Sequence, residues 1–531
     1  MIGAAKAQPG PATLVGLGAL GAVGLLGHVL GLVLVSELGQ QLLGLERGPA
    51  LRLQLGLWSL AGLCWLAGLW LWRRAAASGG WSWRSVAFVG ALAILMRLPA
   101  LVLPIGVVHS NDVYRYFWDG AVQRAGLDPY AGSPESPIYD AVRRDHPDLY
   151  EHINHRHLPT IYPPVAQAAF NFAVRLAPAA PLKIDSTVGG ALWRWRAVCG
   201  AGELGLLLLL GMLLGRAGVD RRWVALPALC PLPVIELWVN AHADWLGLLL
   251  LAAALRFWPR EGAYRWAKGS ALVGGALLML AMLVKPLAGA VLPALLRRRL
   301  RSGLLVAMAV GALLAAAAAW WPYRAAGLHV MPSLGEYGRR WRSNDGAYAL
   351  VHRAAESIVQ WRFQPPAYLP WEPWQSPRLA QFVTGRDRDT VFPDELANFF
   401  ARAFTSALLL GLVGVGLRLR LAAPQLGLLL LSGYALLTPT LHPWYLLWPL
   451  LLAPLWLEAA APVLILTALA PIAYVPLPAE WAGQGHHEPL GWRLVEHGLA
   501  WLAVAFVLMQ FYRRRGAARL RRDIARTAQA V

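Results

Sequence analysis

Long apolar runs separated by short basic clusters constrain this chain more than any other feature of its sequence. A helix that crosses a bilayer needs about 20 mostly apolar residues, and candidate runs of this kind recur along all 531 residues. Hydrophobic residues make up 57% of the chain and charged residues only 15%, whereas soluble domains average about 45–50% and about 25%. The sequence therefore predicts an all-α polytopic membrane protein.

Fourteen apolar runs are candidate membrane spans, and an even number places both termini on one side. The runs are 13–35, 53–72, 85–108, 190–215, 222–240, 243–258, 270–284, 286–297, 302–321, 396–418, 424–440, 443–457, 461–476 and 493–512. The stretch 270–297 is divided at Lys285 because Pro286 disfavours helical backbone at the residue before it. The apolar stretch 161–178 is interpreted as a helix on the outer surface, because a further span there would invert every later loop.

Basic residues support this topology. The net charge is +19, and clusters lie at Arg73/Arg74, Arg221/Arg222, 297–301 and 513–522, between runs or after the last one. An excess of Lys and Arg marks the cytoplasmic side of membrane proteins, so we predict cytoplasmic termini and two large outer loops at 109–189 and 322–395. The basic tail 513–531 is expected to contact anionic membrane lipids. The clusters form no continuous stripe, so nucleic acid is not an expected partner.

Charged and titratable residues also lie within or at the ends of the predicted spans, mostly in their outer halves: Arg97, Glu203, Glu236, Asp244, Lys285, Arg402 and His442. A charge at membrane depth costs about 2.5–3.5 kcal/mol on insertion scales, so such residues are functional candidates by default. Two interpretations stay open. The residues pair with one another, as Arg97 could with Glu203, or they line a polar cavity that opens to the outer side.

The first predicted outer loop begins with a mixture of carboxylates and aromatic rings. Asp112 and Asp119 are seven residues apart, about two helical turns, and can share a helix face. Aromatic residues stand between them, including Tyr116 and Trp118. Such a surface suits a sugar, and a carboxylate within reach of an acceptor hydroxyl can act as a general base. An interfacial belt of aromatic residues with solvated acids would look the same in the sequence.

The pattern DVYRYFWDG…AGLDPY…TIYPPVAQ resembles the first outer loop of the GT-C superfamily, membrane glycosyltransferases that use lipid-phosphate sugars. It is similar to the actinobacterial polyprenol-phosphate-mannose-dependent mannosyltransferases and, more remotely, to GPI mannosyltransferase I. The matching residues are Asp112, Asp119, Gly126, Pro129, Tyr130, Tyr162, Pro163 and Pro164; NAHADW at 240–245, VKPLAGAVLP at 284–293 and LTPTLHPWYLLW at 437–448 also resemble such enzymes. Many relatives carry two adjacent acids where this chain has Asn111–Asp112, which leaves Asp112 as the candidate base.

The resemblance implies a GT-C-like bundle of about 14 transmembrane helices whose outer loops carry interfacial helices. It implies an inverting enzyme that moves a sugar, with mannose the first candidate, from a polyprenyl-phosphate donor to a hydroxyl of a lipid-linked or cell-envelope glycan on the outer face of a bacterial-type plasma membrane. Asp112 would take the proton. The substrate-binding set comprises Lys285, His442, Arg115 and Arg340 for the departing phosphate, Asp119, Asp244 and His242 for orienting sugar or acceptor, and Tyr116 and Tyr162. No cofactor and no metal are expected.

Other interpretations remain. A secondary transporter would also have a polar cavity and a broken helix, although transporter sites tend to lie at mid-membrane between inverted repeats; a lipid-linked glycan ligase or polymerase is a third possibility. The histidines of HINHRH (His152, His155 and His157) and of the pair 486–487 are interpreted as solvated residues rather than zinc ligands. The loop 322–395 is interpreted as an acceptor-side cap.

Overall fold

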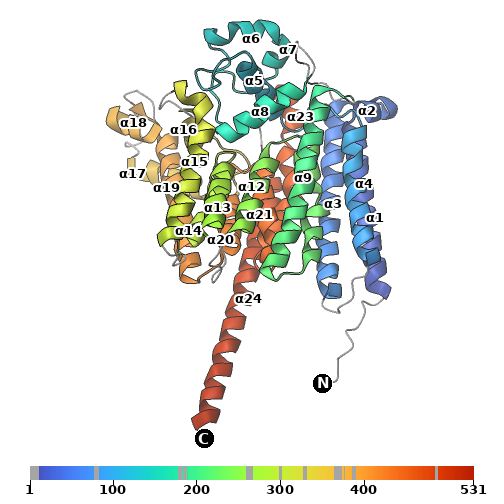
Figure 1. Ribbon diagram of the computed structural model, residues 1–531, viewed down its shortest axis with the longest axis vertical. Coiled ribbons are helices and arrows are strands. Elements are labelled where there is room, and N and C mark those ends of the chain that lie inside the picture. Colours follow the sequence, from blue (N-terminus) through green and yellow to red (C-terminus); the bar gives the residue numbers. More distant parts are fainter. Residues whose placement is uncertain are drawn as a thin grey trace.

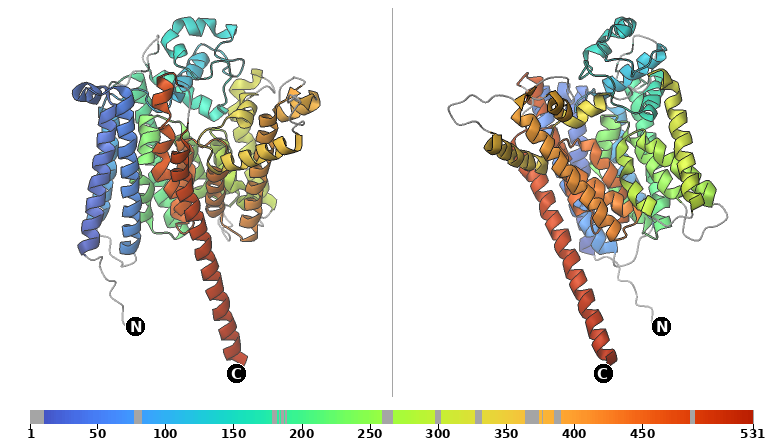
Figure 2. Two further views of the ribbon diagram at one scale, coloured as in Figure 1. Left: turned by 180° about the vertical axis from the view of Figure 1, so that it is seen from behind. Right: turned by 90° about the vertical axis from the view of Figure 1, so that its left-hand side faces the viewer.

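The computed structural model is almost entirely helical, and its long helices stand side by side as one bundle (Figures 1 and 2). It describes residues 11–76, 83–177, 182, 184, 187, 189–258, 267–297, 302–326, 332–363, 374–375, 377–384, 390–484 and 488–530. The prediction of an all-α polytopic membrane protein is confirmed.

The α-helices are α1 (Pro11–Val35), α2 (Glu37–Leu43), α3 (Arg47–Ala76), α4 (Trp83–Val102), α5 (Asp112–Arg124), α6 (Asp140–Asp145), α7 (Pro147–Glu151), α8 (Pro164–Leu176), α9 (Ala191–Ala217), α10 (Ala225–Ala228), α11 (Pro231–Pro233), α12 (Asp244–Phe257), α13 (Ala267–Met282), α14 (Leu292–Arg297), α15 (Ser302–Trp320), α16 (Pro332–Arg340), α17 (Gly346–Phe363), α18 (Pro377–Thr384), α19 (Pro393–Arg418), α20 (Ala423–Leu437), α21 (Leu447–Leu452), α22 (Ala461–Leu469), α23 (Leu477–Trp481) and α24 (Leu490–Ala530). Tighter helical turns are η1 (Pro137–Tyr139), η2 (Arg221–Val224), η4 (Pro286–Val291), η5 (Trp321–Ala326), η6 (Pro443–Leu446), η7 (Ala453–Leu455) and η8 (Ala470–Tyr474), while η3 (Val234–Val239) is a wider π-helical turn. Two short strands, β1 (Trp374–Gln375) and β2 (Thr390–Val391), pair antiparallel.

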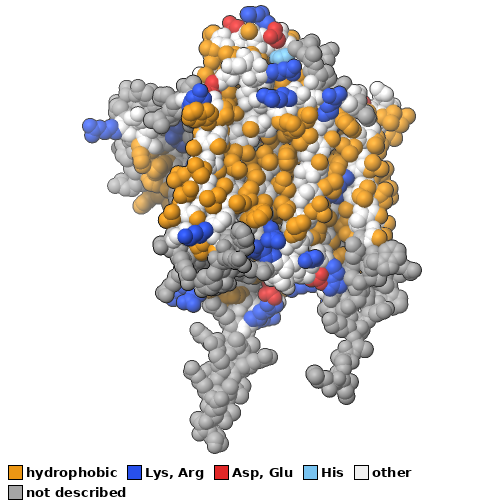
Figure 3. Space-filling view, viewed as in Figure 1, with side chains coloured by type: hydrophobic (Ala, Val, Ile, Leu, Met, Phe, Trp, Pro, Cys, Tyr) orange, Lys and Arg blue, Asp and Glu red, His pale blue; other side chains and the backbone are white. Residues whose placement is uncertain are grey.

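The two ends of the bundle differ. Helices α5 to α8 cover one end, which we call the distal end (Figure 1). Helix α1 begins and α24 ends at the opposite, proximal end, where the last turns of α24 project beyond the other helices (Figures 1 and 2). A broad band of apolar side chains covers the face between the two ends, and Lys and Arg side chains lie along both of its borders (Figure 3). This distribution is typical of a protein surrounded by lipid.

The predicted number of fourteen spans is not confirmed. Among the described residues, seven helices are long and apolar enough to cross a membrane, or eight if the bent pair Arg221–Ala228 and Pro231–Val239 counts as one span. Other apolar runs form shorter helices, such as Ala423–Leu437 and Pro443–Leu455. Proline explains part of the difference, because a ring at the start of a turn removes a backbone donor and interrupts a long helix. Apolar composition alone does not distinguish a run that forms one straight helix from a run that forms several short helical turns.

One local prediction is confirmed, and one of two open interpretations is decided. The helix that contains Met282 ends there, and a new turn begins at Pro286 with Lys285 as an extended residue between them. Arg97 and Glu203 form a buried bidentate ion pair, with Arg97 Nε 2.8 Å from Glu203 Oε2. The pair joins α4 to α9.

The helices of the distal end are closely packed. Helix α5 lies so near α8 that a Cβ atom at Gly120 would stand 2.4 Å from the carbonyl oxygen of Phe170. Only glycine permits this approach, since a side chain there would force the helices apart. Tyr116, Phe117 and Trp118 fill the space beneath. The first turn of α5, which carries Asp112, is thereby fixed over the end of the bundle.

Candidate active site

A cavity of about 540 Å³ lies at the distal end of the bundle. Its walls come from α5, the segment 154–163, η4, α16, α20 and η6, which are far apart in the chain. The polar residues of its lining include Asp112, Arg115, Lys285 and His442. Another part of the lining is apolar and consists of Leu287, Ala290, Leu334, Leu430 and Leu431. The cavity can therefore accommodate a molecule with a charged group and a hydrocarbon part.

Asp112, the first residue of α5, presents its carboxylate to this cavity. Asn154 Nδ2 donates a hydrogen bond to Oδ1 at 3.2 Å, and the Tyr162 hydroxyl donates to Oδ2 at 3.2 Å. Burial raises the pKa of the Asp112 carboxyl above its ordinary value, while these two hydrogen bonds act in the opposite direction. A carboxylate held in place with a raised pKa is a better proton acceptor than a solvated one, which suits a general base.

A chain of buried polar groups lies behind Tyr116, which also lines the cavity. The Tyr116 hydroxyl is 3.1 Å from His242 Nδ1, and His242 Nε2 is 3.4 Å from Glu236 Oε2. Glu236 in turn accepts hydrogen bonds from Asn240 and Tyr474. His242 and Glu236 are both fully buried. His242 is thus held beneath the cavity wall rather than on its surface.

Trp444 connects His242 with the cavity. Its ring stacks on His242 at 4.0 Å on one side and on His442 at 4.4 Å on the other, measured between ring centroids. His442 lines the cavity and is followed by Pro443, the start of η6. The orientation of the His442 imidazole is therefore set by its packing against the indole ring.

The backbone around His242 is strained. Ala241 has a φ of 58°, in the left-handed region that residues with a Cβ atom seldom adopt. Its carbonyl accepts a hydrogen bond from Trp195 Nε1 at 2.9 Å, and the preceding π-helical turn η3 ends at Val239, whose carbonyl accepts from the buried Arg196. Unusual backbone of this kind persists only where surrounding contacts hold it, and it clusters at functional sites.

Lys285 stands at the break between α13 and η4. Its Nζ is 2.7 Å from Asp244 Oδ1 and 4.5 Å from the centre of the Tyr445 ring. Asp244 also accepts a hydrogen bond from Trp448 Nε1 at 2.7 Å. The ammonium group consequently has one fixed position, with a carboxylate on one side and the cavity on the other.

The segment around α16 forms another wall. Tyr337 and Trp341 line the cavity, and the Tyr337 hydroxyl is 2.7 Å from that of Tyr445. The Trp341 ring meets His155 of the first loop edge to face at 4.7 Å. Its carbonyl accepts a hydrogen bond from Thr440 at 2.7 Å, two residues before His442. The two large loops therefore meet at the cavity.

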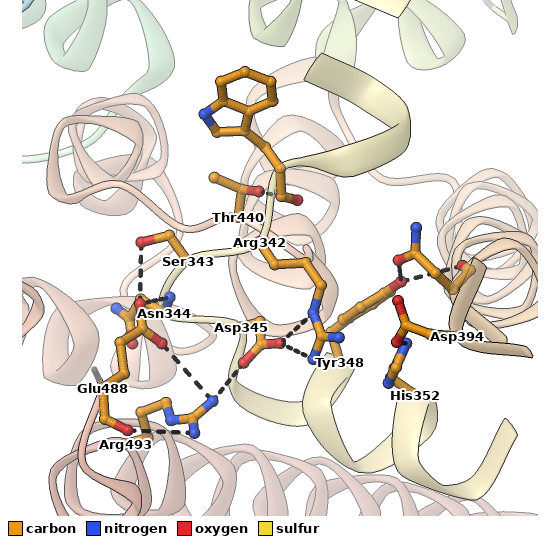
Figure 4. Close-up of polar contacts among 12 residues, drawn as sticks. Arg342, Ser343, Asn344, Asp345, Tyr348, His352, Asp394, Thr440, Glu488 and Arg493 are labelled. Carbon is orange, nitrogen blue, oxygen red and sulfur yellow. Dashed lines mark hydrogen bonds and ion pairs between the residues drawn. The ribbon is translucent and has the colours of Figure 1, made fainter. Parts of the chain in front are cut away.

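A polar cluster anchors this wall to α24 (Figure 4). Asp345 accepts from Arg342 at 2.8 Å and from Arg493 at 2.7 Å. Glu488 accepts from the backbone N–H of Asn344 at 2.6 Å and from the Ser343 hydroxyl at 3.1 Å. Ser343 also pairs by backbone hydrogen bonds with residues 439 and 441. Since the cluster fixes both Trp341 and the turn before His442, it positions one side of the cavity.

The residues predicted from the sequence are divided between the cavity and the layer behind it. In the cavity lining are Asp112, Arg115, Tyr116, Tyr162, Lys285 and His442. Outside the lining are Asp119, which pairs with Arg115 at 2.8 Å, Asp244, His242, and Arg340, which pairs with Glu336 at 2.9 Å. Asp119 and Asp244 each pair with a cation of the lining, Arg115 and Lys285. The predicted pair at 486–487 and the cluster at 298–301 lie outside the described residues.

Several lining residues were not singled out in the sequence, among them Asn154, Tyr337, Trp341 and Tyr445. Tyr445 belongs to the HPWY segment, which is already identifiable in the sequence as similar to glycosyltransferases, so its place in the site could have been predicted. His155, interpreted as a solvated residue, is exposed and also lies against the cavity. Within the described parts of the chain, no group of three or more His, Cys, Asp and Glu residues is arranged to hold a metal ion.

One comparison with known proteins gives a match. A family model described as MptA_B family, alpha-(1->6)-mannopyranosyltransferase, N-terminal domain, matches residues 12–301, which is more than half of the chain. The matched region contains Asp112, Arg115, Tyr162 and Lys285, but not His442. No curated protein and no solved structure matches.

Proposed function

Because the chain belongs to this family of mannosyltransferases and is of the GT-C type, we propose that it transfers a mannosyl group from a polyprenyl-phosphate donor to a hydroxyl of a lipid-linked or cell-envelope glycan. The family assignment favours a glycosyltransferase over the alternative of a secondary transporter. We further propose that the distal end faces the outside of the plasma membrane and that the termini are cytoplasmic.

The proposed reaction is a single displacement at the anomeric carbon. The acceptor oxygen forms a bond to that carbon while the bond from the carbon to the phosphate oxygen breaks, so the configuration inverts. Asp112 takes the proton of the attacking hydroxyl, as a carboxylate in the cavity wall with a raised pKa is suited to do. The bonding electrons leave with the polyprenyl phosphate, which gains one negative charge.

The leaving phosphate is assigned to Lys285 and His442, with Arg115 as a further cation in the lining. Fixed donors and cations stabilise a charge that develops in the transition state, because they need no reorganisation at that moment. Lys285 meets this condition, since Asp244 and the Tyr445 ring hold its ammonium group. Asp244, Asp119 and His242 then act through Lys285, Arg115 and Tyr116 rather than by touching the sugar.

The polyprenyl chain is assigned to the apolar part of the cavity. Leu287 and Ala290 of η4, Leu430 and Leu431 of α20, and Leu334 of α16 line this part. A branched hydrocarbon chain gains about 25 cal/mol for each Å² of its surface that leaves water. An apolar lining beside a fixed cation fits a lipid phosphate better than it fits a sugar nucleotide, whose polar base would lie against leucine side chains there.

The observation that carries the proposal is this single cavity, in which a carboxylate, a cation and an apolar surface meet. The test uses the purified full-length protein with polyprenyl-phosphate-[¹⁴C]mannose and candidate glycan acceptors. We expect radioactivity to pass to the acceptor with inversion at the anomeric carbon, and no transfer from GDP-mannose offered instead. Transfer from GDP-mannose but not from the lipid donor would refute the donor assignment, and no cofactor or metal is proposed to assist.

A further inference from the structure

A second cavity lies far from the candidate active site, near the proximal end of the bundle. Its volume is about 330 Å³, and residues of α4, α9, η2 and α10 line it together with Trp72 of α3. We call it the proximal groove. Several residues of its lining are exposed on the outer surface of the bundle, among them Ile94 of α4 and Leu204 of α9. Nothing in the proposed transfer reaction uses it.

The walls of the proximal groove are apolar over most of their length. They include Val89 and Ile94 of α4 and Leu204 and Leu207 of α9. Ile94 is 62% exposed and Leu204 47% exposed, so the groove is open to the membrane rather than covered by other helices. Gly90 contributes a stretch of wall without a side chain, and a Cβ atom there would meet no atom within 4 Å. The space therefore has the form of a slot for a hydrocarbon chain.

The proximal mouth of the groove carries the basic pair of η2. Arg222 pairs with Asp220, which also caps the turn. Arg221 is exposed and has no hydrogen-bond or ion-pair partner among the residues that the structure describes. Its guanidinium group lies against α9, where a Cβ atom at Gly215 would stand 2.5 Å from Arg221 Nε. The mouth of the groove thus presents the positive charge of Arg221, which packs against α9 and has no acidic partner among the described residues.

The far end of the groove is polar, and the hydrogen-bond donors there already have partners within the protein. Arg97 lines it, and its guanidinium donates to Glu203 and to the carbonyl oxygens of Ala93 and Ala228. Because these donors are already paired, an acyl chain can pack against Arg97 without leaving a buried group unsatisfied. From Val89 to Arg97 is eight residues of α4, about 12 Å, which is the depth that a single acyl chain would follow.

We propose that the proximal groove binds an anionic phospholipid from the leaflet on the side of the chain termini, with one acyl chain between α4 and α9 and its phosphate on Arg221. Charge complementarity selects this occupant. Guanidinium groups bind phosphate with paired hydrogen bonds, and basic residues near a membrane surface favour anionic lipids. A neutral occupant would leave Arg221 uncompensated, and a protein helix would be too wide for a slot between two adjacent helices.

Native mass spectrometry of the purified full-length protein tests the proposal. Phosphatidylglycerol or phosphatidylcholine is added to the detergent-solubilised protein in equal amounts, and the lipid that stays bound is counted. We expect one retained phosphatidylglycerol and about fivefold weaker retention by Arg221→Ala. Arg418→Ala is the matched control, because Arg418 is an exposed arginine that ends α19 and does not line the groove; it should retain lipid as the wild type does.

A second variant fills the slot without removing charge. Gly90→Phe places a ring in the groove, whereas Gly411→Phe on α19 places one at another glycine with open space around it. We expect only the first to lose the bound lipid, with both variants eluting as the wild type does in size-exclusion chromatography. Equal retention by Arg221→Ala and the wild type, or no preference for phosphatidylglycerol over phosphatidylcholine, would overturn the proposal. None of these readouts depends on the transfer reaction.

Discussion

Replacement of Asp112 by Asn separates the proton-accepting role of this side chain from its structural role. The carboxylate receives its hydrogen bonds from Asn154 and Tyr162, each at 3.2 Å. An asparagine has the same shape, its carbonyl oxygen can accept one of these bonds, and the Tyr162 hydroxyl can rotate to accept from the new amide. The variant should therefore fold normally, because at most one modest hydrogen bond is lost, worth about 0.5–1.5 kcal/mol.

The effect on turnover should be much larger. An amide cannot take the proton of the acceptor hydroxyl, and loss of general-base assistance lowers rates by about 10²–10⁴-fold. This range corresponds to about 3–5 kcal/mol of transition-state stabilisation. The KM for the lipid donor should stay close to that of the wild type, since the assigned phosphate contacts, Lys285 and His442, are unchanged.

The assay measures initial rates of [¹⁴C]mannose transfer together with thermal unfolding in detergent. Asp119→Asn serves as the matched comparison, because Asp119 is on the same helix but pairs with the buried Arg115. We expect it to lower the unfolding temperature, since breaking a buried pair leaves an uncompensated charge and costs about 3–5 kcal/mol. If Asp112→Asn kept wild-type turnover while folded Asp119→Asn lost it, the roles assigned to the two carboxylates would be wrong.

Further predictions address the pH profile, the phosphate site, the core and metal dependence. Tyr162→Phe removes a hydrogen bond that lowers the pKa of Asp112, so the acidic limb of the profile of kcat/KM should move to higher pH. Lys285→Met should lower transfer about 10²–10³-fold, as loss of one oxyanion contact does, and Lys285→Arg should restore only part of it in the same assay. Arg97→Met should lower the unfolding temperature by breaking the pair with Glu203, and a second change, Glu203→Gln, should recover much of the loss. Activity should persist in EDTA; a loss that Mg²⁺ restores would require a metal near Asp112.

The helical architecture could be predicted from the sequence to the extent that it depends on apolar length and on proline. The break before Pro286 follows from a local rule of this kind and is confirmed, whereas the pairing of Arg97 with Glu203 was one of two open interpretations until the structure brought the two helices together. The number of spans could not be predicted in the same way. Runs such as 443–457 are apolar throughout, yet their prolines divide them into short turns whose direction depends on the neighbouring helices.

The candidate site was predictable where its residues stand in compact motifs, and not where loops supply them. Asp112, Tyr162 and Lys285 belong to segments with a recognisable pattern, and the cavity brings them together. Asn154 and Trp341 belong to irregular segments without periodicity, so nothing in the sequence indicates that they lie against the same cavity. The stacking of His242 and His442 on one tryptophan likewise depends on the tertiary packing of two distant turns.

Both cations assigned to the cavity share an arrangement that bears on catalysis. Arg115 and Lys285 line it, and each has a buried carboxylate on its far side, Asp119 at 2.8 Å and Asp244 at 2.7 Å. A cation backed by a carboxylate attracts a bound anion less strongly than an isolated cation, but it is fixed in place and its desolvation cost is already offset. A polyprenyl-phosphate sugar carries one negative charge before transfer and its phosphate carries two afterwards, so the interaction strengthens as the bond breaks. Only interactions that are stronger in the transition state than in the ground state accelerate the chemical step, and we infer that Asp119 and Asp244 serve catalysis by holding the two cations where the new charge develops.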